Sequence, residues 1–473
     1  MSHVVAMRRS WLALGIGLPL VAVLAFVPFR NGLRAEGSHE LPSISKLVSG
    51  VSHAPTPSLT GLDLTKISVN DLGATAPLPD KKVAHLTIDP ALQRVAEAVM
   101  SMHHVPEAAV VLMDVQTGKI LVYASHMEKG PARDLCVEAT APAASVFKVV
   151  TGSSLAENAG ITPDQRECYS GGEQKIVQAD LVPDPKRDKW CTTIAGAMGR
   201  SINTVFARSA LKYLKPPQLE GTAKSLGFGS AIPFDVPVQP SAIKIPEDTL
   251  GYARTAAGFW NTTLSPMHAA YLSATMARGG EPIRPVLVAD VAHDDGGKPF
   301  WFAPSSIALK RAIKGETAQA VTTMMESTVS DGTSYRAFHD ARGQSFLPNV
   351  PVAGKTGTLT DPIQQRFYTW FTGFAPSHGM SAEGDAPDTK PPRQVAIAAL
   401  VVNNPTWTIK ANILAREVLR AYFASQKVPN VTTPQLRAGE VTPRNGNDSD
   451  DHDGHPSQPS TTPGTKHRRQ RGS

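Results

Sequence analysis

The amino-acid sequence predicts an α+β domain, in which an antiparallel sheet packs against helices. Runs of strand-forming residues lie at both ends of the central part of the chain, at 108–124 and at 350–402. The residues between these runs have mostly helical patterns, and we find no internal repeat. Strands at both ends with helices between them are typical of this fold class.

The first helix is expected to begin at Pro90, because Asp89 is a good N-cap and proline is favoured as the first helical residue. A hairpin follows, with strands at 108–115 and 119–124 around a turn that contains Gly118.

The end of the domain is expected to hold three more strands, at 350–359, 367–374 and 395–402. A helix at about 408–424 follows them. We therefore predict that the folded domain covers residues 84–425.

The N-terminal region contains 19 consecutive positions without a charge, from Trp11 to Phe29. A helix needs about 20 apolar residues to span a bilayer. Residues 31–36 make a poor cleavage site, which favours an uncleaved anchor over a cleaved signal peptide. We therefore predict a cytoplasmic N-terminus at 1–9 and a single transmembrane anchor at 10–29.

Polar segments flank the predicted domain. Residues 30–83 are rich in Ser, Pro, Thr and Gly, which is typical of a flexible linker, and residues 426–473 are expected to be disordered. Residues 449–454 superficially resemble a calcium loop but lack its first Asp and its distal Glu, since Ser460 stands at that last position. We therefore predict no metal site.

Composition limits the classes of function. The chain has 473 residues and 41% hydrophobic residues, which is enough for a sizeable core. Its net charge is +6, but much of the basic excess lies at the ends, as in the patch at 466–471. We therefore predict no nucleic-acid partner.

The chain has three cysteines. Cys168 and Cys191 flank a polar stretch and form the preferred disulfide pair if the compartment is oxidising, which leaves Cys136 as a thiol. The alternative is that all three are small, independent core residues.

Three short strings carry the candidate chemistry, in the order Ser145-Val146-Phe147-Lys148, Ser201-Ile202-Asn203 and Lys355-Thr356-Gly357-Thr358. The first two patterns also occur elsewhere, at 43–46, 209–212, 241–244 and 68–70, whereas Lys-Thr-Gly occurs once. Single matches are therefore weak, and context must select the functional copies.

Ser145 is expected at the start of a helix over 146–158, where backbone N–H groups favour developing negative charge. Lys148 lies three residues on, on the same helix face, so its amine can reach the Ser145 hydroxyl. A lysine can activate serine as a base only if burial or a nearby cation lowers its pKa, and Lys355 is a candidate for that cation. The alternative for an isolated match is a helix cap followed by a surface lysine.

Ser201 and Asn203 are expected in a loop between two helices. Ser201 can pass a proton between Lys148 and a leaving amine, and Asn203 can orient that lysine. The alternative is that these residues only cap the following helix.

Lys355, Thr356, Gly357 and Thr358 lie on a strand pattern. The lysine and the threonine hydroxyls suit a carboxylate, and glycine allows a ligand to approach the backbone closely. The N–H groups of Thr358 and Ser145 are candidates for an oxyanion hole. The alternative is an ordinary edge strand weakened by glycine.

These strings, in this order, resemble the motifs of the penicillin-binding protein transpeptidase domain. The resemblance covers roughly residues 84–425 and includes further matching segments, at 87–94, 114–124, 264–269, 331–333 and 370–374. One departure is at 257–261, where the family more often has a short glycine-rich turn.

The resemblance implies that Ser145 attacks the D-Ala-D-Ala end of a peptidoglycan stem peptide and that a neighbouring strand's amine then resolves the acyl-enzyme. Lys148 would be the base, Ser201 and Asn203 would assist, and Lys355 with Thr356, Gly357 and Thr358 would hold the substrate. β-Lactams would acylate Ser145 as substrate mimics, and no cofactor is expected.

This function would place the catalytic domain in the periplasm, held to the bacterial cytoplasmic membrane by a single anchor. Cell-wall synthesis proteins such as a glycosyltransferase are further expected partners. Two alternatives stay open: a D,D-carboxypeptidase or β-lactamase that uses water as the acceptor, and a non-catalytic β-lactam sensor or division scaffold.

Overall fold

The computed structural model describes residues 58–171, 175–259, 261–361, 363–378 and 392–434. Within these ranges the chain forms an α+β fold, as the sequence predicts. None of the helices in the described residues combines the length and hydropathy that a bilayer crossing needs. The anchor predicted at 10–29 lies outside the described residues.

The main sheet joins strands from both ends of the domain in the order β12-β13-β14-β4-β5, with every neighbouring pair antiparallel. These strands are β4 (Glu107–Asp114), β5 (Ile120–Met127), β12 (Ala353–Asp361), β13 (Arg366–Ala375) and β14 (Val395–Asn403). All five agree with the strands predicted from sequence to within a few residues.

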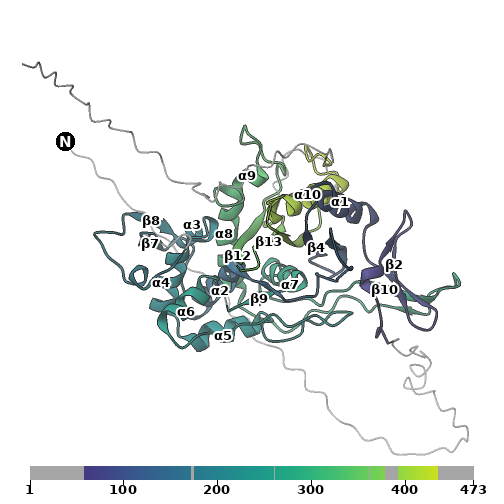
Figure 1. The fold of residues 1–473 in the computed structure, drawn as a ribbon, viewed down its shortest axis with the longest axis horizontal. Helices are drawn as coiled ribbons and strands as arrows, with labels where there is room; N and C mark the ends of the chain where they lie inside the picture. The colour runs from purple at the N-terminus through teal and green to yellow at the C-terminus, as the bar shows by residue number, and fades with distance from the viewer. Residues whose placement is uncertain (1–57, 172–174, 260, 362, 379–391, 435–473) are drawn as a thin grey trace, which may run out of the picture. The chain divides into compact units, whose positions relative to one another are not determined.

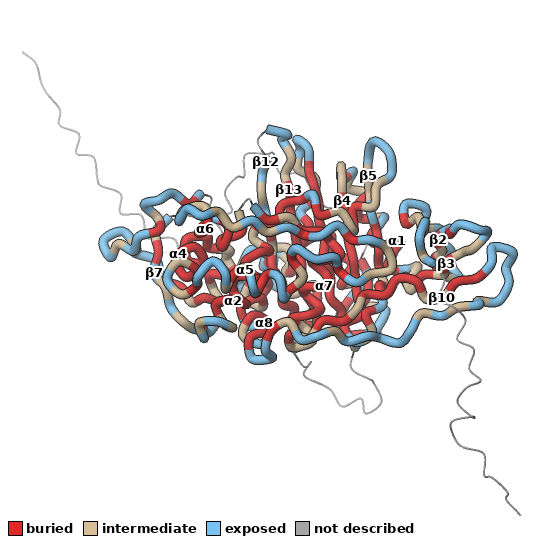
Figure 2. The backbone as a smooth tube through the Cα atoms, turned by 90° about the horizontal axis from the view of Figure 1, so that it is seen from below, coloured by how far each residue is buried: buried red, intermediate tan, exposed pale blue. Residues whose placement is uncertain are grey.

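Helices cover both faces of this sheet (Figure 1). On one face α1 (Pro90–Met102) and α10 (Ala411–Ser425) pack against alternate residues of the central strands. On the other face α7 (Pro266–Ala277) packs against the remaining residues, and α2 (Phe147–Ala159) and α8 (Gly315–Ser330) extend this second core. Figure 2 shows the buried runs along β4, β13 and α7.

Most of the remaining helices and short strands are built around the second core, whereas Phe338 of α9 is buried in the core of α1 and α10. The helices are α3 (Ile194–Gly199), α4 (Asn203–Tyr213), α5 (Pro216–Ser225), α6 (Thr249–Ala256) and α9 (Tyr335–Phe338), with 3₁₀ turns η2 (Leu64–Lys66), η3 (Ala144–Val146) and η4 (Gln178–Leu181). Two short strand pairs are formed by β6 (Ala141–Pro142) with β9 (Thr263–Leu264) and by β7 (Arg166–Tyr169) with β8 (Trp190–Thr193).

A second five-stranded sheet corrects the predicted linker boundary. Its order is β1-β2-β3-β10-β11, formed by β1 (Ser68–Val69), β2 (Ala74–Leu78), β3 (Lys82–Leu86), β10 (Val288–His293) and β11 (Trp301–Phe302). The prediction of a flexible linker extending to residue 83 is therefore wrong for its last part. Alternate residues of β2 are buried because β3 pairs with the distant strand β10, which the composition of 58–83 does not reveal.

The boundary at 426 also changes. Val428 and Val431 are buried against the core that contains α10, so the disordered tail predicted from residue 426 does not begin there. The rest of that tail, from 435 onward, lies outside the described residues.

Candidate active site

Ser145 lies in the 3₁₀ turn η3, directly before α2, rather than at the first position of a regular α-helix. The preceding residue, Ala144, has a φ of 49°, in the left-handed region that costs a non-glycine residue of order 1–3 kcal/mol. Such strain is typical of a turn that the surrounding structure holds in place to present a reactive side chain.

Two glycines allow neighbouring backbones to approach this turn. A Cβ at Gly258 would lie 2.4 Å from the Ala144 carbonyl oxygen, and one at Gly357 would lie 3.2 Å from the Ala144 Cβ. The indole of Trp370 donates a hydrogen bond of 2.9 Å to the Pro142 carbonyl, just before the turn. The turn is therefore packed between β12 and the segment that follows α6.

Lys148 is fully buried in the first turn of α2, and its Nζ has three oxygen neighbours. These are Ser145 Oγ at 2.7 Å, Asn203 Oδ1 at 2.6 Å and the Ala257 carbonyl oxygen at 2.6 Å. The two carbonyl-type oxygens can only accept hydrogen bonds, whereas the serine hydroxyl can also donate one. A neutral Lys148 that donates to Asn203 and Ala257 therefore turns its lone pair toward the Ser145 hydroxyl.

Burial of Lys148 favours this neutral form. Desolvation lowers the pKa of Lys148 well below its ordinary value, and the nearby charge of Lys355 lowers it further. A buried amine without a compensating carboxylate loses its proton more readily, which is what a base for serine needs.

Ser201 lies between α3 and α4, as the sequence predicts, whereas Asn203, also expected in that loop, is the first residue of α4. The N-cap position of α4 is Ile202, with no capping hydrogen bond from its side chain, so the purely capping role considered for this string is not what the geometry shows. Ser201 has a φ of 59° and its Oγ accepts a hydrogen bond of 3.0 Å from Lys355 Nζ. Asn203 contacts Lys148, so the string touches both buried lysines.

Lys355 is fully buried on β12, and its Nζ also donates a hydrogen bond of 2.9 Å to the Thr356 carbonyl. Desolvation lowers the pKa of Lys355 to about 7. At neutral pH this amine is therefore divided between its charged and neutral forms.

The strand β12 lies at the edge of the main sheet among the described strands. Along it Lys355 and Gly357 are buried, Thr356 is half-buried and Thr358 is exposed. An extended peptide can add to such an edge through main-chain hydrogen bonds. The edge therefore offers a binding surface beside Ser145.

The structure also reveals contacts that the sequence did not assign to the site. The Ala257 carbonyl binds Lys148, and the Thr333 hydroxyl lies 2.6 Å from the Thr356 hydroxyl. Ala257 lies in the segment that departs from the family pattern, and a backbone carbonyl leaves no side-chain signal. Thr333 lies in a segment that matches the family, but nothing in its local sequence indicates its partner.

Cys168 and Cys191, the pair preferred from sequence, form a disulfide between β7 and β8. Cys136 is a buried thiol.

Comparison with known proteins identifies the fold and family. The model of the penicillin binding protein transpeptidase domain matches residues 108–381. The chain belongs to this family. The match spans all three strings that carry the candidate chemistry.

One curated relative is the peptidoglycan D,D-transpeptidase PbpA of Mycobacterium tuberculosis, 25% identical over 371 residues. The alignment covers 67% of this chain and 66% of the relative, just under two thirds of its length. Stage V sporulation protein D of Bacillus subtilis is 24% identical, with 69% of this chain and 50% of that protein covered.

Solved structures show the same fold. The D,D-transpeptidase domain of a peptidoglycan glycosyltransferase from Eggerthella lenta superposes with a TM-score of 0.58 at 22% identity, covering 72% of this chain and 83% of that one. A ceftriaxone acyl-enzyme complex of penicillin-binding protein A from M. tuberculosis superposes with a TM-score of 0.57 at 22% identity, covering 72% and 79%.

Proposed function

We propose that this chain is a serine D,D-transpeptidase that cross-links peptidoglycan stem peptides through an acyl-Ser145 intermediate. The observation that carries the proposal is the contact of 2.7 Å between the buried Lys148 amine and the Ser145 hydroxyl. The other two neighbours of that amine, Asn203 Oδ1 and the Ala257 carbonyl oxygen, accept hydrogen bonds from it. A nucleophile and its base within hydrogen-bond reach, with the base oriented by further groups, is the arrangement that covalent catalysis requires.

In the acylation step, Ser145 Oγ attacks the carbonyl carbon between the two terminal D-alanines while its proton passes to Lys148 Nζ. The carbonyl oxygen becomes an oxyanion, for which the N–H groups of Ser145 and Thr358 are the proposed donors. The C–N bond then breaks and the terminal D-Ala leaves as a free amine after it receives a proton, for which Ser201 is the proposed relay.

In the second step, an amine from another stem peptide attacks the acyl-serine ester. The new amide bond forms, the C–O bond to Ser145 breaks, and the serine recovers its proton. Lys148, again neutral, removes the proton from the attacking amine.

Substrate recognition would use the edge strand β12, beside Ser145. A cationic Lys355, together with the hydroxyls of Thr356 and Thr358, suits the terminal carboxylate of the donor peptide. The hydrogen bond between Thr333 and Thr356 holds one of these hydroxyls in place. β-Lactams carry a carboxylate beside an acylating carbonyl, so the same groups would bind them.

The proposal extends to location. We infer that residues 10–29 anchor the chain in the bacterial cytoplasmic membrane with the catalytic domain in the periplasm, because its substrate lies outside the cytoplasm. A glycosyltransferase that makes the glycan strands is the corresponding partner. Reporter fusions after residue 9 and after residue 434 should report opposite sides of the membrane, and the same side for both would refute the anchor.

The function is tested with a fluorescent penicillin. The full-length chain should form a covalent adduct that persists for many minutes, and the Ser145→Ala variant should form none. Rapid release of the label would indicate a hydrolase instead. An adduct that survives in Ser145→Ala would reject Ser145 as the nucleophile, and no adduct in the wild type would reject the proposal.

A further inference from the structure

The segment between Cys168 and Cys191, here called the disulfide loop, is attached to the two helices that supply the acceptors of Lys148. It is described at 168–171 and 175–191. At its base, Cys168 and Cys191 face each other across the β7–β8 pair and are bonded. The loop therefore has a closed base, and its interior packs against α4 and α6.

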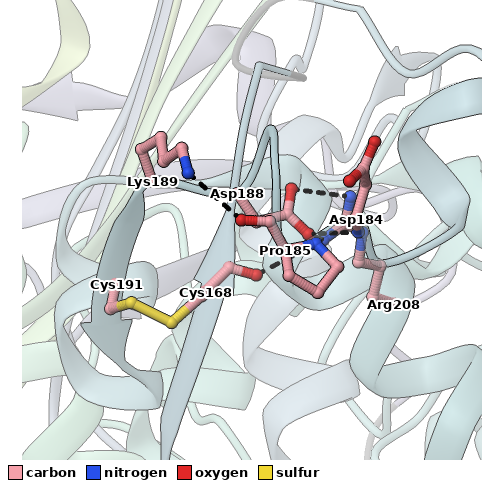
Figure 3. Close-up of a disulfide and its surroundings, with 7 residues drawn as sticks. All are labelled: Cys168, Asp184, Pro185, Asp188, Lys189, Cys191 and Arg208. Carbon is pink, nitrogen blue, oxygen red and sulfur yellow. Dashed lines mark hydrogen bonds and ion pairs between the residues drawn. A yellow bond between two sulfur atoms is a disulfide. The ribbon is translucent and has the colours of Figure 1, made fainter.

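The first attachment is to α4. Arg208 is 9% exposed and Asp188 is 5% exposed, and their side chains form an ion pair with an N–O distance of 2.7 Å. Arg208 also donates to the carbonyl oxygens of Asp180, at 2.5 Å, and of Cys168 and Val182, both at 3.3 Å. Figure 3 shows this guanidinium between Asp188 and the Cys168 carbonyl, beside the disulfide.

The second attachment is to α6. Arg254 donates two hydrogen bonds, of 3.0 and 2.7 Å, to the Ile176 carbonyl in the loop. The Ile176 side chain is buried in a small apolar cluster that is separate from the two main cores. The cluster joins the loop to both helices and consists of Ile176, Leu181, Ala207, Ala253 and Ala257.

The two helices meet at the catalytic amine. Asn203, whose Oδ1 accepts from Lys148, is the first residue of α4. Ala257, whose carbonyl accepts from the same amine, is the C-cap of α6 and also a member of the loop's apolar cluster. The position of both acceptors therefore depends on how α4 and α6 pack against each other, and the disulfide loop binds both.

We propose that the disulfide loop is a positioning element for the acylation step, which holds Asn203 and Ala257 so that the Lys148 lone pair faces Ser145. Ile176 and Arg208 are the positioning residues, and the disulfide keeps the loop closed around them. This inference rests on the proposed function, because it assigns a task to the same site. A loop with a purely structural role would change the free energy of unfolding alone, whereas a positioning element would also change the acylation rate.

The consequence for chemistry is specific. If α4 and α6 separate slightly, the amine loses its two fixed acceptors and water reaches it. Its lone pair is then no longer aimed at the hydroxyl, and the penalty that disfavours its charged form becomes smaller. Acylation should become slower, and its rise with pH should move to higher pH.

The experiment measures the second-order rate of acylation by a fluorescent penicillin as a function of pH, with the full-length chain. Three variants weaken the attachments: Ile176→Ala, Arg208→Lys and the double variant Cys168→Ser/Cys191→Ser. We expect each to lower the acylation rate by about tenfold to a hundredfold, since small misplacements of catalytic groups have effects of this size. We also expect the rising limb of each pH profile to move upward.

Two controls match these variants. Ile176→Val keeps most of the buried side chain and should retain the wild-type rate and pH profile. Arg187→Ala removes an exposed arginine of the same loop, and among the described residues its side chain bonds to Asp184 and Ala179, both within the loop. This variant should also behave as wild type. Thermal unfolding verifies that each variant is folded at the assay temperature, and if the cysteine variant is not, Ile176→Ala decides.

The proposal would be overturned if the folded variants Ile176→Ala, Arg208→Lys and Cys168→Ser/Cys191→Ser became acylated at the wild-type rate and with the wild-type pH profile. An equal loss of acylation rate in Arg187→Ala would also overturn it. So would a lower acylation rate in the three variants with an unchanged pH profile, because the loop would then act on stability alone. A wild type that forms no adduct would instead reject the proposed function, so the two failures are distinguishable.

Discussion

The candidate active site and the contact between α4 and the disulfide loop both bury cations, but these cations have different partners. Beside the loop, Arg208 of α4 is paired with Asp188 of the loop and donates to the carbonyl oxygens of three other loop residues. In the candidate active site, none of the described carboxylates forms an ion pair with Lys148 or Lys355, and the hydrogen bonds of the two amines go to neutral oxygens.

The difference follows from what each residue can do with its proton. Arginine keeps its charge under all ordinary conditions, so a buried guanidinium must be paired. Lysine can lose its proton, and burial without a partner lowers its pKa, which is how these two lysines differ from surface ones. The comparison teaches that the buried cation paired with the loop suits a structural role, whereas the two lysines of the candidate active site have the environment that the proposed proton transfer and carboxylate binding require.

The largest expected effect tests the unpaired base. Lys148→Ala should slow acylation of Ser145 by about 10²–10⁴-fold, the usual contribution of a positioned base. The matched control is Lys212→Ala, which removes the lysine of a second Ser-x-x-Lys string whose amine is exposed and lies 3.6 Å from Glu167. Adduct formation with a labelled penicillin measures both, and a Lys148→Ala variant as fast as the control would remove this residue from the mechanism.

The next effect tests the paired cation. Asp188→Asn leaves Arg208 buried without its counter-charge, which should lower the free energy of unfolding by roughly 3–5 kcal/mol. Arg187→Ala breaks an exposed ion pair in the same loop and should change stability little. Denaturant unfolding of both variants provides the measurement, and equal midpoints would show that burial does not distinguish the two pairs.

The smallest expected effect concerns pH rather than overall rate. Binding of a substrate carboxylate needs a charged Lys355, whose pKa of about 7 means that the charge is present below that pH and lost above it. Acylation should therefore rise with pH as Lys148 becomes neutral and then fall as Lys355 loses its proton.

Lys355→Arg isolates the falling limb. Arginine stays charged, so the decline above pH of about 7 should move to much higher pH even if the maximal rate is lower. A pH series of acylation rates for both proteins shows the limb directly. A decline that stays at the same pH in Lys355→Arg would assign it to another group.

The local elements follow from local signals. The hairpin predicted at 108–124 is confirmed as β4 and β5, and the three strands predicted near the end of the domain are confirmed as β12, β13 and β14. Continuous runs of β-branched and aromatic residues favour buried strands. Asp89 caps α1 through hydrogen bonds to the N–H groups of Ala91 and Leu92, as the Asp-Pro pair indicates. Gly160 ends α2 in the left-handed conformation.

The second sheet could not be predicted from its own residues. The strands at 68–86 are short, contain Ala, Thr and Pro, and gain their burial from β10, which lies far along the chain. The composition of this segment is typical of a linker and gives no sign that the segment is folded. It folds because pairing with distant strands outweighs its weak local β propensity.

By itself, the sequence determined the residue types of the site and their order: an acylable hydroxyl with a lysine one helical turn away, a Ser-x-Asn loop and a Lys-Thr-Gly strand. These depend only on spacing along single elements. The tertiary structure alone decided that β12 lies beside η3, that the Ala257 carbonyl and Asn203 converge on Lys148, and that a disulfide loop contacts their two helices. Those relations join residues far apart in the chain, and the burial that lowers the pKa of both lysines arises only when the whole domain has packed around them.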